Sequence, residues 1–391
     1  MVLSVNPETQ TKGAPVFVMI AGEASGDLLG ADLMIALKGQ YPQAQFLGIG
    51  GQKMITEGLQ SWFPIEKLSV MGFFEVLKHL PELLSIRRTC IQKLLDIRPD
   101  AVIGIDAPDF NLKVEAAAKQ AGIPAIHYVG PSVWAWREKR LYKIKKQVDG
   151  VLVLFPFELD YYHKYGIAAK YVGHPLAKQV IEAPTQRVAK QQLGLAEKAM
   201  VTGLLPGSRM SEIERMTDIY IQVAVKIQTI HPNMVFVIPC VHAMAKQRIE
   251  KSILDYGLGL KVVLLDQQSQ LAMAASDQLL VTSGTATLEA ALMQRPMILV
   301  IKLHPISYWI MKRLATTEWI GLPNILAKKN IVPEYIQADA TVENIALGLA
   351  KLIQDQKQRS TQLSEFRQQT KQLQCNSAVL AVEAIQEWAH L

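Results

Sequence analysis

Short apolar runs alternate with longer amphipathic stretches along nearly the whole chain. The runs cover residues 15–20, 45–49, 101–105, 125–129, 150–155 and 170–175, and then residues 200–205, 235–238, 261–265, 278–282 and 297–301. Continuous apolar runs of this length between helical stretches are typical of buried strands in a parallel sheet. The pattern therefore predicts an α/β protein with two Rossmann-like halves.

A polar stretch separates the two series of strands. It covers Ile181 to Gln192 and contains Pro184, and the strand–helix alternation restarts after it. A chain of 391 residues is long enough for two separate cores. We predict an N-terminal domain over residues 1–180, a C-terminal domain over residues 181–360 and a helical tail over residues 361–391.

One stretch of the first half, residues 68–84, has apolar side chains at helical spacing and basic residues beside it. The apolar members include Val70, Phe73, Phe74 and Leu77, and the basic neighbours include Arg87 and Arg88. Two interpretations are open, a helix in a membrane interface and an ordinary core helix. Pro81 is expected to interrupt any continuous helix here.

Charge and cysteine content narrow the class of protein. The net charge is +6 and the pI is about 9.0, which suits phosphorylated or anionic lipid partners. No RNP-type motif, zinc-finger spacing or long basic run is present, so we expect no nucleic-acid partner. The three cysteines form no CxxC pair, so neither a metal site nor a disulfide framework is expected, and a reducing cytoplasm fits.

The chain has no segment that predicts export or a membrane span. The first 13 residues are polar, without the apolar core of a signal peptide. No run of about 18 uncharged apolar residues occurs. Attachment to a membrane face stays open.

A strand end in the first half carries two carboxylates. The run over residues 101–105 continues as Asp106-Ala107-Pro108-Asp109-Phe110-Asn111. Open α/β sheets bind ligands outside the carboxyl ends of their strands. Asp106 or Asp109 can therefore serve as a general base, a metal ligand or a helix cap, and Asn111 is expected to fix the loop.

An acidic residue also follows the first strand of the chain. Ala21-Gly22-Glu23-Ala24-Ser25-Gly26-Asp27 follows it, and these glycines do not form GxGxxG. The alternative to a ligand site is a tight turn with a helix cap at Ser25 or Asp27. Glu23 is placed where the strand meets the ligand edge of the sheet.

The first strand of the second half ends in a candidate anion site. Gly207, Ser208 and Arg209 follow it, just before an expected helix. Backbone N–H groups at a helix start and a planar guanidinium both bind phosphate oxygens. GxxxxGK[ST] is absent, so this is not a Walker loop.

A later strand of the second half has a similar end. Its residues are Ser283, Gly284, Thr285, Ala286 and Thr287, with Glu289 one turn into the expected helix. The helix directs its positive end at this loop. Glu289 can accept hydrogen bonds from ribose hydroxyls or complete a capping box. Further along, Asn324 can bind a ligand or a turn.

These segments together resemble one family. AGEASGD (21–27), GIDAPDFN (104–111), GPSVWAWR (130–137), LLPGSR (204–209), SGTATLE (283–289) and LPNIL (322–326) are similar to motifs of lipid-A-disaccharide synthases, in order, over about residues 14 to 385. The resemblance implies the GT-B glycosyltransferase architecture, with two Rossmann-like domains whose parallel sheets face a central cleft. By analogy with GT-B proteins, residues 377–391 are expected to pack on the N-terminal domain.

The resemblance also implies an inverting reaction. The donor would be UDP-2,3-diacylglucosamine and the acceptor 2,3-diacylglucosamine 1-phosphate, giving the β-1,6-linked tetraacyl disaccharide 1-phosphate and UDP. It implies no cofactor, no required metal and peripheral attachment to the cytoplasmic face of the inner membrane. Asp106 matches the family's essential base, Arg209 and Glu23 are expected to assist catalysis, and residues 207–209, 283–287, Glu289 and Asn324 are expected to bind the UDP-sugar. Two positions depart from the family pattern, Gly130 and the segment 301–305.

Rival functions remain on the same architecture. They are a UDP-sugar 2-epimerase, a glycosyltransferase with a soluble acceptor, and a non-catalytic nucleotide-sugar binding protein. A soluble acceptor would not require the apolar, basic stretch over residues 68–88, and a binding protein would not require an acid at Asp106. The oligomeric state is open, with a homodimer as the candidate.

Overall fold

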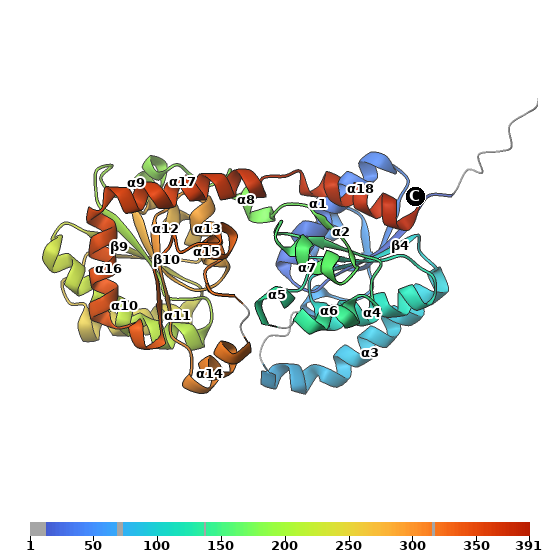
Figure 1. The fold of residues 1–391 in the computed structure, drawn as a ribbon, viewed down its shortest axis with the longest axis horizontal. Helices are drawn as coiled ribbons and strands as arrows, with labels where there is room; N and C mark the ends of the chain where they lie inside the picture. Colours follow the sequence, from blue (N-terminus) through green and yellow to red (C-terminus); the bar gives the residue numbers. More distant parts are fainter. Residues whose placement is uncertain (1–12, 69–72, 137, 315–316) are drawn as a thin grey trace, which may run out of the picture. The chain divides into compact units, whose positions relative to one another are not determined.

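The chain forms two compact units (Figure 1). The computed structural model describes residues 13–68, 73–136, 138–314 and 317–391. Unit 1 comprises the chain up to Gly173 together with Cys375–Leu391, and unit 2 comprises His174–Gln374. Each unit is built on one parallel sheet with helices packed against it, as the alternation of apolar runs predicts.

Unit 1 contains a seven-stranded sheet in the order β3-β2-β1-β4-β5-β6-β7. The strands are β1 (Val16–Ala21), β2 (Gln45–Ile49), β3 (Leu59–Ser61), β4 (Ala101–Ile105), β5 (Ala125–Tyr128), β6 (Gly150–Val153) and β7 (Ala168–Tyr171). Every neighbouring pair is parallel. All residues of β4 and β5 are buried, which explains why their sequences are continuous apolar runs.

Unit 2 contains a six-stranded parallel sheet in the order β10-β9-β8-β11-β12-β13. The strands are β8 (Val201–Leu205), β9 (Val235–Cys240), β10 (Val262–Asp266), β11 (Gln278–Thr282), β12 (Met297–Ile301) and β13 (Glu334–Ile336). The central strands β8, β11 and β12 are buried along their whole length.

Helices connect the strands in both units. Those of unit 1 are α1 (Ala24–Gln40), α2 (Gln52–Thr56), η1 (Ile65–Lys67), α3 (Phe73–Ile97), α4 (Pro108–Gln120), α5 (Val133–Trp136), η2 (Glu138–Arg140), α6 (Leu141–Ile144), α7 (Glu158–Lys164) and α18 (Ser377–Ala389). Those of unit 2 are α8 (Pro175–Gln179), α9 (Gln186–Gln192), α10 (Met210–Ile230), α11 (Ala243–Tyr256), α12 (Ser269–Ala275), α13 (Thr285–Leu292), α14 (Pro305–Leu314), α15 (Leu322–Ala327), η3 (Gln337–Asp339), α16 (Val342–Gln354) and α17 (Gln356–Leu373).

All strands expected from the apolar runs are confirmed. The sequence patterns missed β3 and β13, which have three residues each and lie at the edges of their sheets. A three-residue edge strand has no apolar run of its own, because it is only partly buried. It forms only through its hydrogen bonds to the adjacent strand.

The expected helix break at Pro81 is wrong. Helix α3 continues through Pro81, so the missing N–H group and the bulk of the proline ring do not end the helix there. In the C-terminal half of α3, Ile86, Cys90 and Leu94 pack into the core of unit 1. Four apolar residues were named for the candidate membrane helix over residues 68–84. Val70 and the side chains of Phe73, Phe74 and Leu77 lie outside the described residues. Of the basic neighbours, Arg88 is exposed and Arg87 is partly exposed.

The C-terminal helix α18 belongs to unit 1. It packs against α1, β6 and β7. The Gln386 side-chain amide donates to the Tyr41 hydroxyl at 3.0 Å, and Lys170 pairs with Glu383 at 2.9 Å. Trp388 occupies the space above Gly150, where any side chain would overlap its ring. Within the described ranges, the structure contains no helix that is long and apolar enough to span a bilayer.

Strand order fixes where ligands can enter each sheet. The connections reverse direction between β1 and β4 in unit 1, and between β8 and β11 in unit 2. The crevice at the carboxyl edge of such a reversal is the usual ligand site of an open parallel sheet. The loops that carry Glu23 and Asp106 follow β1 and β4, and the loops that carry Ser208 and Ser283 follow β8 and β11. All four predicted loops therefore lie at reversal points.

Candidate active site

Asp106 occupies a constrained turn at the carboxyl end of β4. Its φ is +53° and that of Ala107 is +45°, so two successive residues other than glycine are left-handed. Such a backbone is unfavourable unless the surroundings enforce it, and it is concentrated at functional sites. The Asp106 N–H donates to the Tyr128 carbonyl at 2.8 Å. Its carboxylate accepts no hydrogen bond from the described part of the chain.

The neighbouring loop after β1 packs tightly on this turn. Strands β1 and β4 pair in register, with Ala21 opposite Ile105. At Gly22 a Cβ atom would lie 2.7 Å from the Ala107 Cβ, so a larger residue would displace the turn. Glu23 follows as the N-cap residue of α1, in an extended conformation. The structure therefore brings the loops of Asp106 and Glu23 together at one edge of the sheet.

Asp27 does not cap its own helix. Its carboxylate accepts hydrogen bonds from the N–H groups of Gly51, Lys53 and Met54, at 2.8, 3.1 and 3.0 Å. These groups lie at the start of α2, so Asp27 caps a helix whose N-cap residue, Gly51, is 24 residues further along the chain. For Asp27, the alternative interpretation as a cap of its own helix is wrong, because its partners are remote in sequence. The Asp27 carboxylate therefore stabilises the fold, whereas Glu23 lies at the carboxyl edge of the sheet, where ligands bind.

A buried polar network lies beneath Asp106. Asn111 and Glu115 project from one face of α4 onto Gly104, where a side chain would overlap the Glu115 carboxylate. His127 on the neighbouring strand β5 pairs with Glu115, with Nδ1 at 2.8 Å from Oε1, and both side chains are fully buried. Desolvation raises the pKa of the Glu115 carboxyl, and His127 opposes that shift. The network holds the strand end that carries Asp106.

Asp109 lies outside this network. Its side chain is 94% exposed, and its carboxylate accepts a 2.7 Å hydrogen bond from Arg140. The residue before α4 is Ala107, and it provides no side-chain cap. Neither Asp106 nor Asp109 caps the start of α4 in the way that the alternative interpretation required.

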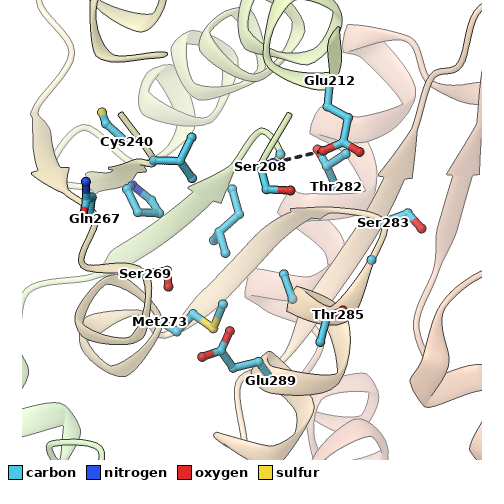
Figure 2. A pocket seen from close by; sticks show the side chains of 16 residues that line it. Ser208, Glu212, Cys240, Gln267, Ser269, Met273, Thr282, Ser283, Thr285 and Glu289 are labelled. Carbon is cyan, nitrogen blue, oxygen red and sulfur yellow. Dashed lines mark hydrogen bonds between the residues drawn. The ribbon is translucent and has the colours of Figure 1, made fainter. Parts of the chain in front are cut away.

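Unit 2 contains a cavity of about 520 Å³ at its reversal point (Figure 2). Its lining includes seven of the expected UDP-sugar residues, namely Gly207, Ser208, Ser283, Gly284, Thr285, Ala286 and Glu289. The opposite wall comes from the ends of β9 and β10, with Cys240 and Gln267. Sequence reasoning missed this wall, because its residues have no distinctive chemistry and only the strand order brings them to the cavity.

Glu212 closes the loop after β8. Its Oε2 accepts hydrogen bonds from the N–H groups of Ser208 at 3.0 Å and Arg209 at 3.3 Å. Figure 2 shows the Ser208 bond at the rim of the cavity. The Arg209 guanidinium lies 3.3 Å from Oε1 of the same carboxylate and is 78% exposed. Arg209 therefore lies beside the cavity, outside its lining, and Glu212 holds its charged end.

The loop after β11 leads directly into α13. Gly284 has a φ of +134°, which only glycine adopts easily, and Thr287 Oγ1 donates to the Gly284 carbonyl at 2.9 Å. The Thr287 N–H donates to the Gly284 carbonyl at 3.1 Å. The N–H groups before it, at the start of α13, have no acceptor within the helix and can bind an anion. Burial raises the pKa of the Glu289 carboxyl, and a hydrogen bond from Gln270 opposes that shift. Glu289 lines the cavity and does not form a capping box.

Asn324 has a different environment. It is fully buried, and its Oδ1 accepts from the N–H groups of Ile331 and Val332 at 2.9 and 2.8 Å. Its Nδ2 donates to the Val332 carbonyl and to the Glu334 carboxylate, each at 2.8 Å. The structure thus places Asn324 outside the cavity lining, where it ties α15 to β13. Across the described residues, no cluster of His, Cys, Asp and Glu has the arrangement of a metal site.

Comparisons of sequence agree over nearly the whole chain. The family model for lipid-A-disaccharide synthetase matches residues 17–385. A lipid-A-disaccharide synthase of Hydrogenovibrio crunogenus is 65% identical over 373 residues, which cover 95% of this chain and 99% of that protein. The synthase of Pseudomonas putida is 45% identical over 367 residues, covering 94% and 97%.

Comparisons of structure reach much more distant proteins. A putative UDP-N-acetylglucosamine 2-epimerase of Listeria monocytogenes has a TM-score of 0.64 at 11% identity, covering 96% of both chains. An Anabaena protein in complex with UDP and glucose has a TM-score of 0.55 at 14% identity, covering 97% of this chain and 100% of that one. Identities this low show the fold alone, which is that of GT-B glycosyltransferases and epimerases.

Proposed function

The chain belongs to the lipid-A-disaccharide synthase family, and from that premise we propose its substrates and the roles of its residues. It is a glycosyltransferase of lipid A biosynthesis. The donor is UDP-2,3-diacylglucosamine and the acceptor is 2,3-diacylglucosamine 1-phosphate. A 2-epimerase is not favoured, because the likeness to epimerases is limited to the fold while 65% identity links the chain to a synthase.

Asp106 is the general base in this proposal. The acceptor 6-hydroxyl oxygen bonds to the anomeric carbon of the donor as the bond from that carbon to the UDP oxygen breaks. The hydroxyl proton passes to the Asp106 carboxylate, and the bonding electrons leave with UDP. The observation that carries the proposal is the place of Asp106 on an enforced left-handed turn at the reversal point of its sheet, where its carboxylate accepts no hydrogen bond from the described residues.

The cavity of unit 2 binds the UDP part of the donor. The start of α13 directs N–H groups at the diphosphate, and Arg209 at the rim supplies a cation for the charge that develops on UDP. Glu289 lines the same cavity with a partly buried carboxylate, which suits ribose hydroxyls. Glu23 supports the acceptor in unit 1, next to the turn of Asp106.

Incubation with both acylated substrates tests the reaction. Purified protein in detergent micelles is expected to form a tetraacyl disaccharide phosphate and one UDP per disaccharide, measured by mass spectrometry and by UDP release. Conversion of UDP-N-acetylglucosamine to its 2-epimer with no disaccharide product would contradict the proposal. A donor with one acyl chain removed serves as the control for recognition of the lipid.

We also propose attachment to the inner face of the inner membrane. Both substrates carry acyl chains, and the protein carries a net charge of +6, which suits anionic lipid. Arg87 and Arg88 lie on α3, the helix that also carries Phe73, Phe74 and Leu77. Replacing those three apolar residues with Ser is expected to reduce flotation with liposomes; unchanged flotation would assign them to the core. Sedimentation of the purified protein tests the candidate homodimer.

A further inference from the structure

Helix α14 of unit 2 has large apolar side chains of which half or more is exposed. Trp309 is 57% exposed and Met311 is 50% exposed. In Figure 1 the helix, drawn in orange, projects from the edge of its unit. It follows β12 directly, and Gln337 holds the connecting loop by accepting a 2.6 Å hydrogen bond from the Leu303 N–H. Exposed tryptophan on an anchored helix indicates a surface that binds something apolar.

Basic side chains accompany these apolar ones. The guanidinium of Arg313 lies 4.3 Å from the centre of the Trp309 ring, and the ammonium of Lys312 lies 6.0 Å from that of Tyr308. Both cations are exposed. Trp309 and Arg313 are one helical turn apart, as are Tyr308 and Lys312, so aromatic rings and cations occupy the same side of the helix.

The sequence of α14 and its flanks has no acidic residue. From Ala290 to Thr317 it contains no Asp or Glu, whereas it contains Arg295, Lys302, Lys312 and Arg313. A protein partner with an acidic, apolar face and a bilayer with anionic lipid are both complementary to such charge. Tryptophan, tyrosine and methionine beside lysine and arginine match the bilayer interface, where rings lie at head-group level and cations reach phosphates.

We propose that α14 binds the surface of a bilayer that contains anionic phospholipid, as a second contact in addition to α3. The proposal rests on the proposed function in one respect, since acylated substrates require the protein to reach a bilayer. Trp309 enters the interface on the side of the helix that it shares with Arg313, and Lys312 and Arg313 bind lipid phosphates. No covalent step is involved.

Co-flotation of the full chain with vesicles tests the apolar part. The vesicles contain phosphatidylcholine with one quarter phosphatidylglycerol. Trp309→Ser with Met311→Ser is expected to lower the partition coefficient about tenfold, in the natural chain and in a chain that also carries the three Ser replacements in α3. The matched control, Leu254→Ser with Leu347→Ser, removes two apolar side chains of unit 2 that are 66% and 73% exposed, and should leave partitioning unchanged.

Charge reversal tests the electrostatic part. Lys312→Glu with Arg313→Glu should weaken binding to the anionic vesicles by at least about 25-fold, at roughly fivefold for each lost cation, and change binding to pure phosphatidylcholine little. Lys198→Glu with Lys251→Glu changes the net charge equally at exposed sites elsewhere in unit 2 and should have a much smaller effect. Vesicles with brominated lipid give an independent readout. They should quench the fluorescence of the natural chain more than that of Trp309→Phe.

Three results would overturn the proposal. One is equal partitioning of the Trp309 and Met311 double variant and its control; the second is equal quenching with and without Trp309. The third is loss of transfer by that variant on substrates in detergent, with unchanged partitioning, which would assign the surface to a substrate or to the chain itself. Failure of the proposed function can be told apart from failure of this proposal. If the proposed function is wrong, the natural chain forms no disaccharide from substrates in detergent, while its binding to vesicles is as expected here.

Discussion

The side-chain amide of Asn111 donates a 2.8 Å hydrogen bond to the carbonyl oxygen of Asp106. The same nitrogen lies 3.1 Å from the carbonyl of Ile20 and 3.3 Å from that of Ile105. One buried amide therefore holds the carboxyl ends of β1 and β4 and the first left-handed residue. This is the contact that enforces the strained turn, and it confirms the expectation that Asn111 fixes the loop.

Asn111→Ala should reduce kcat about 10- to 100-fold with little change in KM for the donor. Without the amide, the Asp106 turn can relax toward an ordinary backbone and the carboxylate loses its position. The free energy of unfolding should also fall by about 1–3 kcal/mol, because buried carbonyls lose a partner. Steady-state kinetics and chemical denaturation measure the two effects.

Gln362→Ala provides the matched control for this variant. Gln362 is a fully buried amide of unit 2 that accepts from the Met297 N–H at 2.8 Å and donates to its carbonyl at 3.0 Å. A similar loss of stability with nearly normal kcat is expected. If both variants lost kcat equally, general destabilisation would explain the effect of Asn111.

Asp106→Asn should remove transfer while UDP binding stays intact. A positioned general base contributes about 10²- to 10⁴-fold to the rate, and an amide cannot accept the proton. Calorimetry with UDP and a transfer assay on the same preparation give the two readings. Asp109→Asn is the control; its 94% exposed side chain should change turnover by less than about threefold. Near-normal turnover in Asp106→Asn would remove Asp106 from the role of base.

Strand positions and loop chemistry could be predicted from the sequence because both are local signals. Continuous apolar runs marked the central strands, and an acid or a glycine-rich segment after a run marked a ligand edge. The strand order then makes Asp106 and Glu23 neighbours. The short edge strands and the continuation of α3 through Pro81 were not predicted, because contacts with neighbouring elements determine both.

The use of a polar side chain was harder to predict than its location. Asn324 follows a loop pattern that suits a ligand, but residues seven to ten positions later take up its hydrogen bonds. Asp27 has the spacing of a local cap, and its partners belong to α2. Glu212 did carry a recognisable signal, an acid three residues after Arg209, the N-cap residue of α10, and this signal was missed.

Arg209→Ala should lower kcat/KM by about 10²- to 10³-fold, since a cation aimed at the leaving group acts mainly in the transition state. Stability should change by less than about 0.5 kcal/mol, because the Arg209 side chain is 78% exposed. Arg209→Lys should restore only part of the rate, because a point charge replaces a planar fork. Arg215→Ala, an exposed arginine on the same helix, is the control and should retain full activity. A normal kcat/KM in Arg209→Ala would contradict the assignment.

Glu158 should make the stability of the protein fall as pH rises. Burial raises the pKa of its carboxyl to about 8, although the N–H of Phe155 and the indole of Trp134 donate to it at 3.0 and 3.1 Å. In the unfolded chain the pKa is near 4.5. Between these values the folded state binds more protons than the unfolded one, so the contribution is complete below about pH 4.5 and is lost by about pH 8. Its size is on the order of a few kcal/mol.

Glu158→Gln removes this titration. The free energy of unfolding should therefore decline less steeply between about pH 5 and about pH 8 in the variant than in the natural chain. Urea denaturation at several pH values measures the slope. The variant is expected to be less stable at pH 5, because an amide cannot accept both hydrogen bonds, and closer to the natural protein at pH 8. Glu387→Gln, at an exposed site on α18, should leave the slope unchanged. Parallel curves for Glu158→Gln and the natural chain would show that Glu158 titrates normally in the fold.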